Sequence, residues 1–276
     1  FGRINYSYQD KFLLEVNGRY DGSSRLSADK KWGFFPSFSA GYVLTQEDYM
    51  DFARPYLSFL KLRGSWGEIG NQNASLGNIY RIMSSSNSGW VMNGVNQLTV
   101  GTPGALPVGL TWETVTTLDF GLDSRFFNNR LGLSFDWYER TVSDIHSPGV
   151  TLPSTFGTTP PRRNYGELTT EGWEVALDFK HSFDNGLNIF AGATLSDYKQ
   201  VVSKYSNTTA NLPNQIFGRN STYYEGMTIG EIWGYETDRL FTEADFNADG
   251  SFADGVPEQN TFQSTKPSWF NWGPGD

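Results

Sequence analysis

The residues that could carry out chemistry are few in this chain of 276 residues. It has no cysteine and only two histidines, His146 and His181. The lack of Cys excludes disulfides, thiolate nucleophiles and Cys-ligated metal sites, and two histidines exclude multi-histidine metal sites. His146 lies close to Asp144 and Ser147 in the sequence, but a catalytic triad needs base and nucleophile in hydrogen-bond geometry. We therefore expect no enzymatic activity.

One acidic segment near the end of the chain has the spacing of a calcium loop. Its pattern matches the opening D-x-N-x-D-G, in which oxygen ligands alternate and a glycine permits a sharp turn. The twelfth position is Val256 rather than Glu, and no flanking helices are evident. The segment is interpreted either as a calcium site or as an acidic turn. The calcium ligands would be Asp245, Asn247, Asp249 and Ser251.

The stretch 69–110 combines amide side chains with aromatic rings. Aromatic rings stack on the apolar faces of sugars, while amide and guanidinium groups satisfy hydroxyls. Tyr80 and Trp90 would serve as platforms and Arg81 as a polar clamp for an oligosaccharide or a peptide. The alternative is a surface loop that packs on itself. The candidate ligand-binding residues are Asn71, Gln72, Tyr80, Arg81 and Trp90.

The composition limits the class of protein. Aromatic residues make up 16% of the chain and charged residues 18%, which is too aromatic for a disordered chain. The net charge is -9, and the basic residues are scattered singly, so no nucleic-acid partner is expected. No apolar run reaches the roughly 18 residues that a membrane-spanning helix needs.

The elements that must position these residues are strands. Apolar and polar residues alternate strictly in several segments, as in Phe12, Leu14 and Val16, and period-two alternation is typical of a strand. Asn128-Asn129 and the segment 184–186 are typical of hairpin turns. Together with less regular segments, the pattern predicts about eight long strands, antiparallel and connected up and down.

The connections between these strands alternate in length. Tight turns or modest links are expected at 9–11, 45–56, 128–130 and 183–186, and long loops at 21–32, 69–110, 146–163 and 204–276. An up-and-down sheet then has all long loops at one end, which is typical of an outer-membrane β-barrel. Aromatics beside the tight turns suit an interfacial girdle, although they would also fit the core of a soluble all-β protein. The link 45–56 is predicted to be one short helix with Thr45 as its N-cap.

Several segments resemble the SusC/RagA-type TonB-dependent transporters of the outer membrane of Bacteroidetes-like bacteria. The likeness covers nearly the whole chain, with the motifs in the same order. The segments that carry it are 3–8, 18–24, 31–41, 60–67 with 70–72, 112–113 with 119–123, 164–167 with 172–174, 230–235 and 272–276.

The resemblance implies that residues 1–276 are part of a barrel of about 22 strands in the outer membrane, with the long loops outside and the short helix in the periplasm. The plug, the TonB-box segment and the closing strand of such a transporter are not in this sequence, so we expect a fragment. The expected partners are a SusD-like surface lipoprotein, TonB, the lipid bilayer and an oligosaccharide or peptide cargo. Two alternatives stay open: a secreted glycan-binding β-sandwich, and a hydrolase on a barrel that uses His146 or His181.

Overall fold

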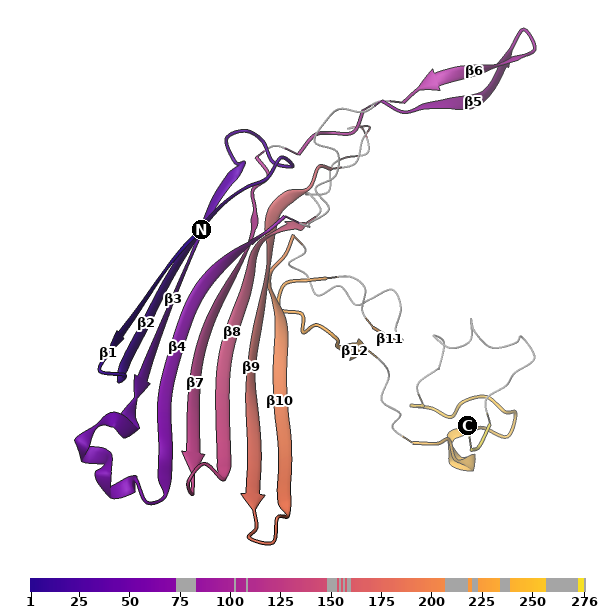
Figure 1. Ribbon diagram of the computed structural model, residues 1–276. Coiled ribbons are helices and arrows are strands. Elements are labelled where there is room, and N and C mark those ends of the chain that lie inside the picture. The colour runs from indigo at the N-terminus through magenta and orange to yellow at the C-terminus, as the bar shows by residue number, and fades with distance from the viewer. Residues whose placement is uncertain are drawn as a thin grey trace. The chain divides into compact units, whose positions relative to one another are not determined.

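The computed structural model of the protein contains one large antiparallel sheet. The structure describes residues 1–72, 83–101, 103–107, 109–147, 153, 155, 157, 160–206, 218–219, 223–233, 239–256 and 273–275. Eight strands form the sheet in the order β1-β2-β3-β4-β7-β8-β9-β10, each antiparallel to its neighbours, as Figure 1 shows. These strands are β1 (Gly2–Tyr8), β2 (Phe12–Gly22), β3 (Trp32–Val43), β4 (Leu57–Asn71), β7 (Glu113–Phe126), β8 (Leu131–Ser147), β9 (Arg163–Ser182) and β10 (Asn188–Lys204).

The expected fold class is confirmed by this sheet. The strands lie in one continuous layer, which leaves β1 and β10 as its two edges. A β-sandwich needs two sheets packed face to face, and the eight long strands instead share a single sheet, so the β-sandwich alternative is wrong. Among the described residues, no helix has the length and apolar character required to cross a membrane.

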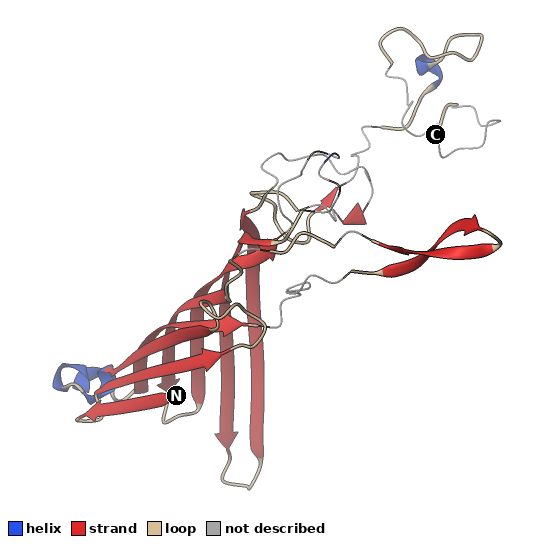
Figure 2. Ribbon diagram, turned by 90° about the horizontal axis from the view of Figure 1, so that it is seen from above, coloured by secondary structure: helices blue, strands red, loops and turns tan. Residues whose placement is uncertain are grey.

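The turns follow from residues that accept a left-handed backbone. Asn128 and Asn129 have φ of 56° and 63° between β7 and β8, and Gly186 has φ of 87° between β9 and β10. Asparagine and glycine adopt this region at low cost. Because successive strands of the sheet run up and down, the short connections lie at one end of the sheet and the long ones at the other, as Figures 1 and 2 show.

The link between β3 and β4 differs in detail from the prediction. It contains two 3₁₀ segments, η1 (Leu44–Gln46) and η2 (Asp48–Ala53), rather than one continuous helix. The N-cap of η2 is Glu47, so the assignment of Thr45 as N-cap is wrong. The hydroxyl of Thr45 instead accepts a hydrogen bond from the backbone N–H of Leu60, at 3.4 Å. Pro55 follows closely and prevents a longer helix.

A hairpin that the sequence analysis did not predict lies within the stretch 69–110. Strands β5 (Ser85–Met92) and β6 (Val95–Val100) pair around a two-residue turn, Asn93-Gly94, with φ of 52° and 75°. Asn-Gly between apolar residues is a strong hairpin signal. The serine-rich and asparagine-rich start of β5 lacks alternation, which is why periodicity alone did not reveal it.

The end of the chain forms a second compact unit, residues 214–219 and 232–276. It contains the short pair β11 (Gly218–Arg219) and β12 (Ile232–Trp233), and the 3₁₀ segment η4 (Glu243–Asp245). Three aromatic rings, those of Phe241, Phe246 and Phe252, pack on one another with centroids 5.3 to 5.6 Å apart.

The large sheet has one apolar and one polar face. Register places Leu122, Phe135 and Val175 in one row across β7, β8 and β9, and their neighbours Asp123 and Asp136 belong to the opposite face. Aromatic pairs reinforce the apolar face, among them Phe12 with Tyr42, Phe38 with Trp66, and Phe120 with Trp137. Many of these apolar side chains are exposed in the isolated sheet, so this face requires an apolar neighbour outside the chain.

Candidate functional site

A small apolar cluster is buried at the end of the sheet that carries the long connections. It consists of Leu26, Phe35, Leu110 and Trp112. The rings of Phe35 and Trp112 meet edge to face, with centroids 5.4 Å apart and planes at 72°. Leu26 belongs to the connection between β2 and β3, and Leu110 to the connection that enters β7. The cluster therefore ties two long connections to the sheet.

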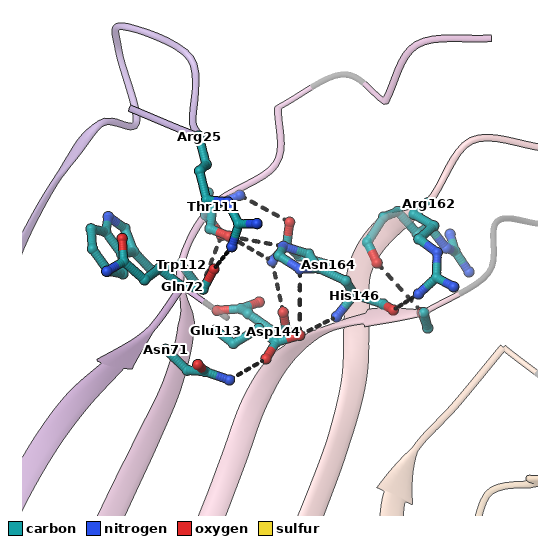
Figure 3. A network of polar contacts seen from close by, with 12 residues as sticks. Arg25, Asn71, Gln72, Thr111, Trp112, Glu113, Asp144, His146, Arg162 and Asn164 are labelled. Carbon is teal, nitrogen blue, oxygen red and sulfur yellow. Dashed lines mark hydrogen bonds and ion pairs between the residues drawn. The ribbon is translucent and has the colours of Figure 1, made fainter. Parts of the chain in front are cut away.

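A buried carboxylate lies at the start of β7. Glu113 accepts a hydrogen bond from the Asn71 side-chain amide at 2.9 Å and another from the backbone N–H of His146 at 3.0 Å, as Figure 3 shows. Glu113 as a whole is only 7% exposed. The His146 ring approaches the backbone oxygen of Thr111 through Nε2 at 3.0 Å. Its Nδ1 is 3.4 Å from Glu113 Oε1 without hydrogen-bond geometry.

His146 reaches this carboxylate because β8 is bulged just before it. The register of β8 shifts between Val142 and Ile145, and Asp144 has a φ of 57° inside this bulge. A bulge leaves a residue unpaired and redirects the side chains that follow. The backbone oxygen of Asp144 accepts a hydrogen bond from the Asn164 side-chain amide at 2.7 Å. Asn164 thereby holds the bulge in place.

Asn164 and two arginines connect the remaining segments. The Asn164 side-chain oxygen accepts from the Thr111 N–H at 2.9 Å, and its amide nitrogen donates to the Thr111 oxygen at 3.1 Å. Arg162 donates to the backbone oxygen of His146 at 3.2 Å, and Arg25 donates to that of Gln72 at 2.9 Å. We call this set the loop-end network: Arg25, Asn71, Gln72, Thr111, Glu113, Asp144, His146, Arg162 and Asn164.

The loop-end network contains two of the predicted ligand-binding residues. The Asn71 amide is engaged by Glu113, and Gln72 contributes its backbone oxygen. Trp90 lies on β5 and is 74% exposed. Tyr80 and Arg81 lie outside the described residues. Ligand binding by these residues stays a prediction, with Asn71 also in a structural role.

Seven of the nine residues of the loop-end network were not predicted as ligand-binding residues: Arg25, Thr111, Glu113, Asp144, His146, Arg162 and Asn164. His146 was considered only as a catalytic base. Alternation gave no signal for the bulge, because Asp144 has the same polar parity as Ser134 and Asp136 on β8. The pairing of Glu113 with a residue 33 positions away had no signal in a single sequence.

The polar face of the sheet carries its own ion cluster. Arg63 on β4 lies among the carboxylates of Asp119, Asp123 and Asp136, with N–O distances of 3.6, 3.1 and 2.6 Å. The Ser134 hydroxyl donates to Asp123 at 2.8 Å. One guanidinium thus joins three strands, and the cluster keeps an excess of negative charge on this face.

The first residue of the predicted calcium loop has other partners. The carboxylate of Asp245 accepts two hydrogen bonds from Arg239, at 2.5 and 2.6 Å, and one from the backbone N–H of Thr242 at 2.7 Å. The Arg239 guanidinium in particular holds the pKa of Asp245 far below its usual range, and Thr242 adds to this. Asp245 therefore caps η4.

The other predicted calcium ligands form a compact turn. Asp249 accepts hydrogen bonds from the backbone N–H and the hydroxyl of Ser251, at 3.0 and 2.6 Å, and these lower the pKa of Asp249. The Asn247 amide donates to the same hydroxyl at 3.0 Å. Within the described part of the chain, no three His, Asp or Glu side chains gather as metal ligands would. Calcium binding stays a prediction, and the turn is held by its own hydrogen bonds.

Comparison with known proteins places the chain among outer-membrane receptors. The family model described as "TonB dependent receptor-like, beta-barrel" matches residues 1–273. TonB-dependent receptor P26 of Formosa agariphila is 34% identical over 73% of this chain and 20% of the relative. TonB-dependent receptor SusC of Bacteroides thetaiotaomicron is 29% identical over 92% of this chain and 27% of the relative.

Solved structures give the same result. The RagAB peptide importer in its closed-closed state matches with a TM-score of 0.64 and 25% identity, over 77% of this chain and 23% of that chain. The present chain thus spans about a fifth to a quarter of the length of these relatives. These relatives are receptors and transporters rather than enzymes, which confirms the prediction of no enzymatic activity. The chain belongs to the TonB-dependent receptor β-barrel family of the outer membrane, and within that family it is of the SusC/RagA type.

Proposed function

We propose that residues 1–276 form part of the wall of an outer-membrane transporter that imports a nutrient. The apolar face of the eight-stranded sheet contacts lipid, and the polar face, with the Arg63 cluster, lines the lumen. The observation that carries this proposal is the course of the apolar band across the sheet. A wall in a bilayer must keep this band level while its strands are tilted.

Relative to the rows of paired residues, the lower edge of the apolar band lies higher on each successive strand from β9 to β3. Phe179 on β9 shares a row with Phe126 on β7, whereas Tyr42 on β3 shares a row with Leu122 on β7. Phe126 lies four residues beyond Leu122, and β9 and β3 are four steps apart in the sheet. A climb of about one residue (~3.4 Å) per strand spacing of ~4.8 Å corresponds to a tilt of roughly 35°.

The upper edge climbs in the same direction. Trp173 on β9 and Trp137 on β8 are paired, and their row continues through Phe120 to Gly64 on β4. The tryptophan of β4, Trp66, lies two residues higher. Tilts of roughly 35–45° are those at which transmembrane barrels close, so a level band bounded by aromatics supports a lipid-facing surface.

The two ends of the sheet then have different surroundings. In outer-membrane barrels the short turns face the periplasm and the long loops face the outside. This orientation puts the loop-end network at the outer mouth of the barrel. Its role is to hold the ends of the loops 69–110 and 146–163 against the sheet while the loops contact the cargo. The segment 204–276 is the third long outer loop in this proposal.

The cargo in this proposal is an oligosaccharide or a peptide. The segment 83–101, which contains the β5–β6 hairpin, has no charged residue, and Trp90 is largely exposed on it. An uncharged surface with an aromatic ring suits neutral cargo, which it binds by stacking. SusC and the RagAB peptide importer are relatives of the chain, and they support pairing with a SusD-like surface lipoprotein and energy supply through TonB.

The cargo assignment is tested by uptake in cells that carry the complete receptor. Cells are offered a mixed pool of neutral oligosaccharides and a pool of peptides, and the imported molecules are identified by mass spectrometry. Replacement of Trp90 by Ala is expected to lower uptake from one pool several-fold. Trp66→Ala, at the upper edge of the lipid-facing band, serves as the control and is expected to change uptake little. Equal uptake by the Trp90 variant and the unmodified receptor would contradict a stacking role.

A further inference from the structure

The 3₁₀ segment η2 has three distinct sides. In a 3₁₀ helix, side chains three residues apart lie above one another. Asp48, Asp51 and Arg54 therefore share one side, and an Arg54–Asp51 ion pair at 2.9 Å agrees with this. Met50 and Ala53 share a second, half-buried side that faces the protein.

The third side of η2 is aromatic and exposed. It carries Tyr49 and Phe52, whose side chains are 60% and 79% exposed. Tyr56 lies after η2 in the chain and is 67% exposed. Aromatic side chains with this exposure on one side of a short helix require an apolar or interfacial neighbour.

The aromatic side of η2 continues the apolar face of the sheet. The ring of Tyr42 stacks on that of Phe12 at the lower edge of this face, with centroids 4.8 Å apart and planes at 6°. The Tyr42 hydroxyl lies 3.3 Å from the Tyr49 hydroxyl, which belongs to the aromatic side of η2. The same hydroxyl donates to Glu47 at 3.0 Å, and Lys11 also binds Glu47, at 3.1 Å. These contacts fix η2 below the apolar band.

We propose that η2 is an interfacial anchor, which rests its aromatic side, Tyr49 and Phe52, on the headgroup region of the periplasmic leaflet. Both rings are suited to this zone, because the Phe52 ring meets the acyl boundary and the Tyr49 ring does the same while its hydroxyl stays in the hydrated layer. The acidic side with Asp48 and Asp51 then faces the periplasm. The inference rests on the proposed lipid-facing role of the apolar face and adds a contact below it.

Single cysteines test this anchor cleanly, because residues 1–276 contain no Cys. The complete receptor, with any other cysteines replaced, is reconstituted in phosphatidylcholine vesicles. A polarity-sensitive fluorophore is attached at Phe52→Cys, Asp51→Cys or Leu177→Cys in separate preparations. Nitroxide-labelled lipid quenches a probe in the bilayer, and iodide quenches a probe in water. All three side chains are exposed or lie on the outer surface of the sheet, so each label is accommodated without repacking.

The anchor predicts that the probe at 52 is quenched by shallow nitroxide lipid and is several-fold less sensitive to iodide than the probe at 51. The probe at 177, in the middle of the apolar band, reports on the lipid-facing role itself. Lipid quenching at 177 with strong iodide quenching at 52 overturns the anchor and leaves the proposed function intact. An absence of lipid quenching at 177 overturns both.

Discussion

At the scale of single residues, Glu113 is the centre of the loop-end network. Its carboxylate accepts hydrogen bonds from the Asn71 amide and from the backbone N–H of His146 while being almost fully buried. Removing one partner from a buried hydrogen bond leaves the other unsatisfied, at a cost of about 1–3 kcal/mol. Glu113 therefore couples the ends of β4, β7 and β8.

Replacement of Glu113 by Ala is predicted to loosen this end of the sheet. Amide hydrogen exchange in the complete receptor should accelerate by about 5- to 150-fold around 109–113 and 144–147, which corresponds to about 1–3 kcal/mol. Glu171→Ala, at an exposed position on β9, is the matched control and should leave these segments unchanged. Unchanged exchange in the Glu113 variant would show that the network does not hold the loops.

Glu47 gives a prediction about pH at the opposite end of the sheet. The hydrogen bond from Lys11 lowers the pKa of Glu47 most in the folded protein, and the hydrogen bond from Tyr42 lowers it further. A depressed folded pKa stabilises the fold above the ordinary pKa of about 4.3, and this contribution is lost as the pH falls through the lower folded value. The link 44–56 should therefore loosen only below about pH 4.

The measurement for Glu47 is its carboxyl carbon shift, followed by NMR titration of the receptor in detergent. The titration midpoint should lie below the ordinary glutamate value and move back toward it in the Lys11→Met variant. A midpoint at or above the ordinary value in the unmodified receptor would contradict the contact with Lys11.

At the scale of elements, β9 presents alternate residues to two different environments. Leu177 lies on the apolar face beside Leu133 and Ala193, and Ala176 lies on the polar face. An arginine in the middle of a lipid-facing band costs about 2–4 kcal/mol, whereas lumen positions tolerate polar residues. Leu177→Arg should therefore reduce the folded fraction of receptor in vesicles strongly, and Ala176→Arg only slightly. Folding is read from the heat-dependent shift in gel mobility, and equal effects of the two variants would argue against two distinct faces.

Most of the elements could be predicted from the sequence because alternation and turn residues are local signals. The strands from β1 to β10 that form the large sheet follow from the period of two and from turns such as Asn128-Asn129. The β5–β6 hairpin was missed because only its Asn93-Gly94 turn carried a signal. The predicted 45–56 helix is interrupted at Glu47, whose backbone is extended between η1 and η2. The side chain of Glu47 binds Lys11, which lies 36 positions away and is in no local pattern.

The candidate site was less predictable than the fold. Asn71 was identified as a polar loop residue, but its structural partner Glu113 lies 42 positions away. The approach of His146 to Glu113 depends on the bulge at Asp144 and on Asn164, which lies on the next strand. Such a network follows from the register of four strands, and register was not fixed by the sequence analysis.

At the scale of the whole molecule, the sheet has an exposed apolar face and two edge strands, β1 and β10, and among the described residues only the end of β10 is paired, with residues 226–229. A sheet of this kind is stable when lipid covers its apolar face and neighbouring strands pair with its edges. Both needs are met in a closed barrel of the TonB-dependent receptor family. The negative Arg63 cluster on the opposite face then belongs to the lumen, where charged groups remain hydrated or paired.

The most direct test of the central claim is an accessibility scan along β9 in the complete receptor in lipid vesicles. Spin labels are placed one at a time at positions 172–180, and collisions with oxygen, which partitions into lipid, are compared with collisions with a water-soluble nickel complex. The account predicts a period of two, with high oxygen accessibility at 173, 175, 177 and 179 and low values between them. Uniform accessibility to the nickel complex at all positions, or the absence of a period of two, would contradict a lipid-facing wall.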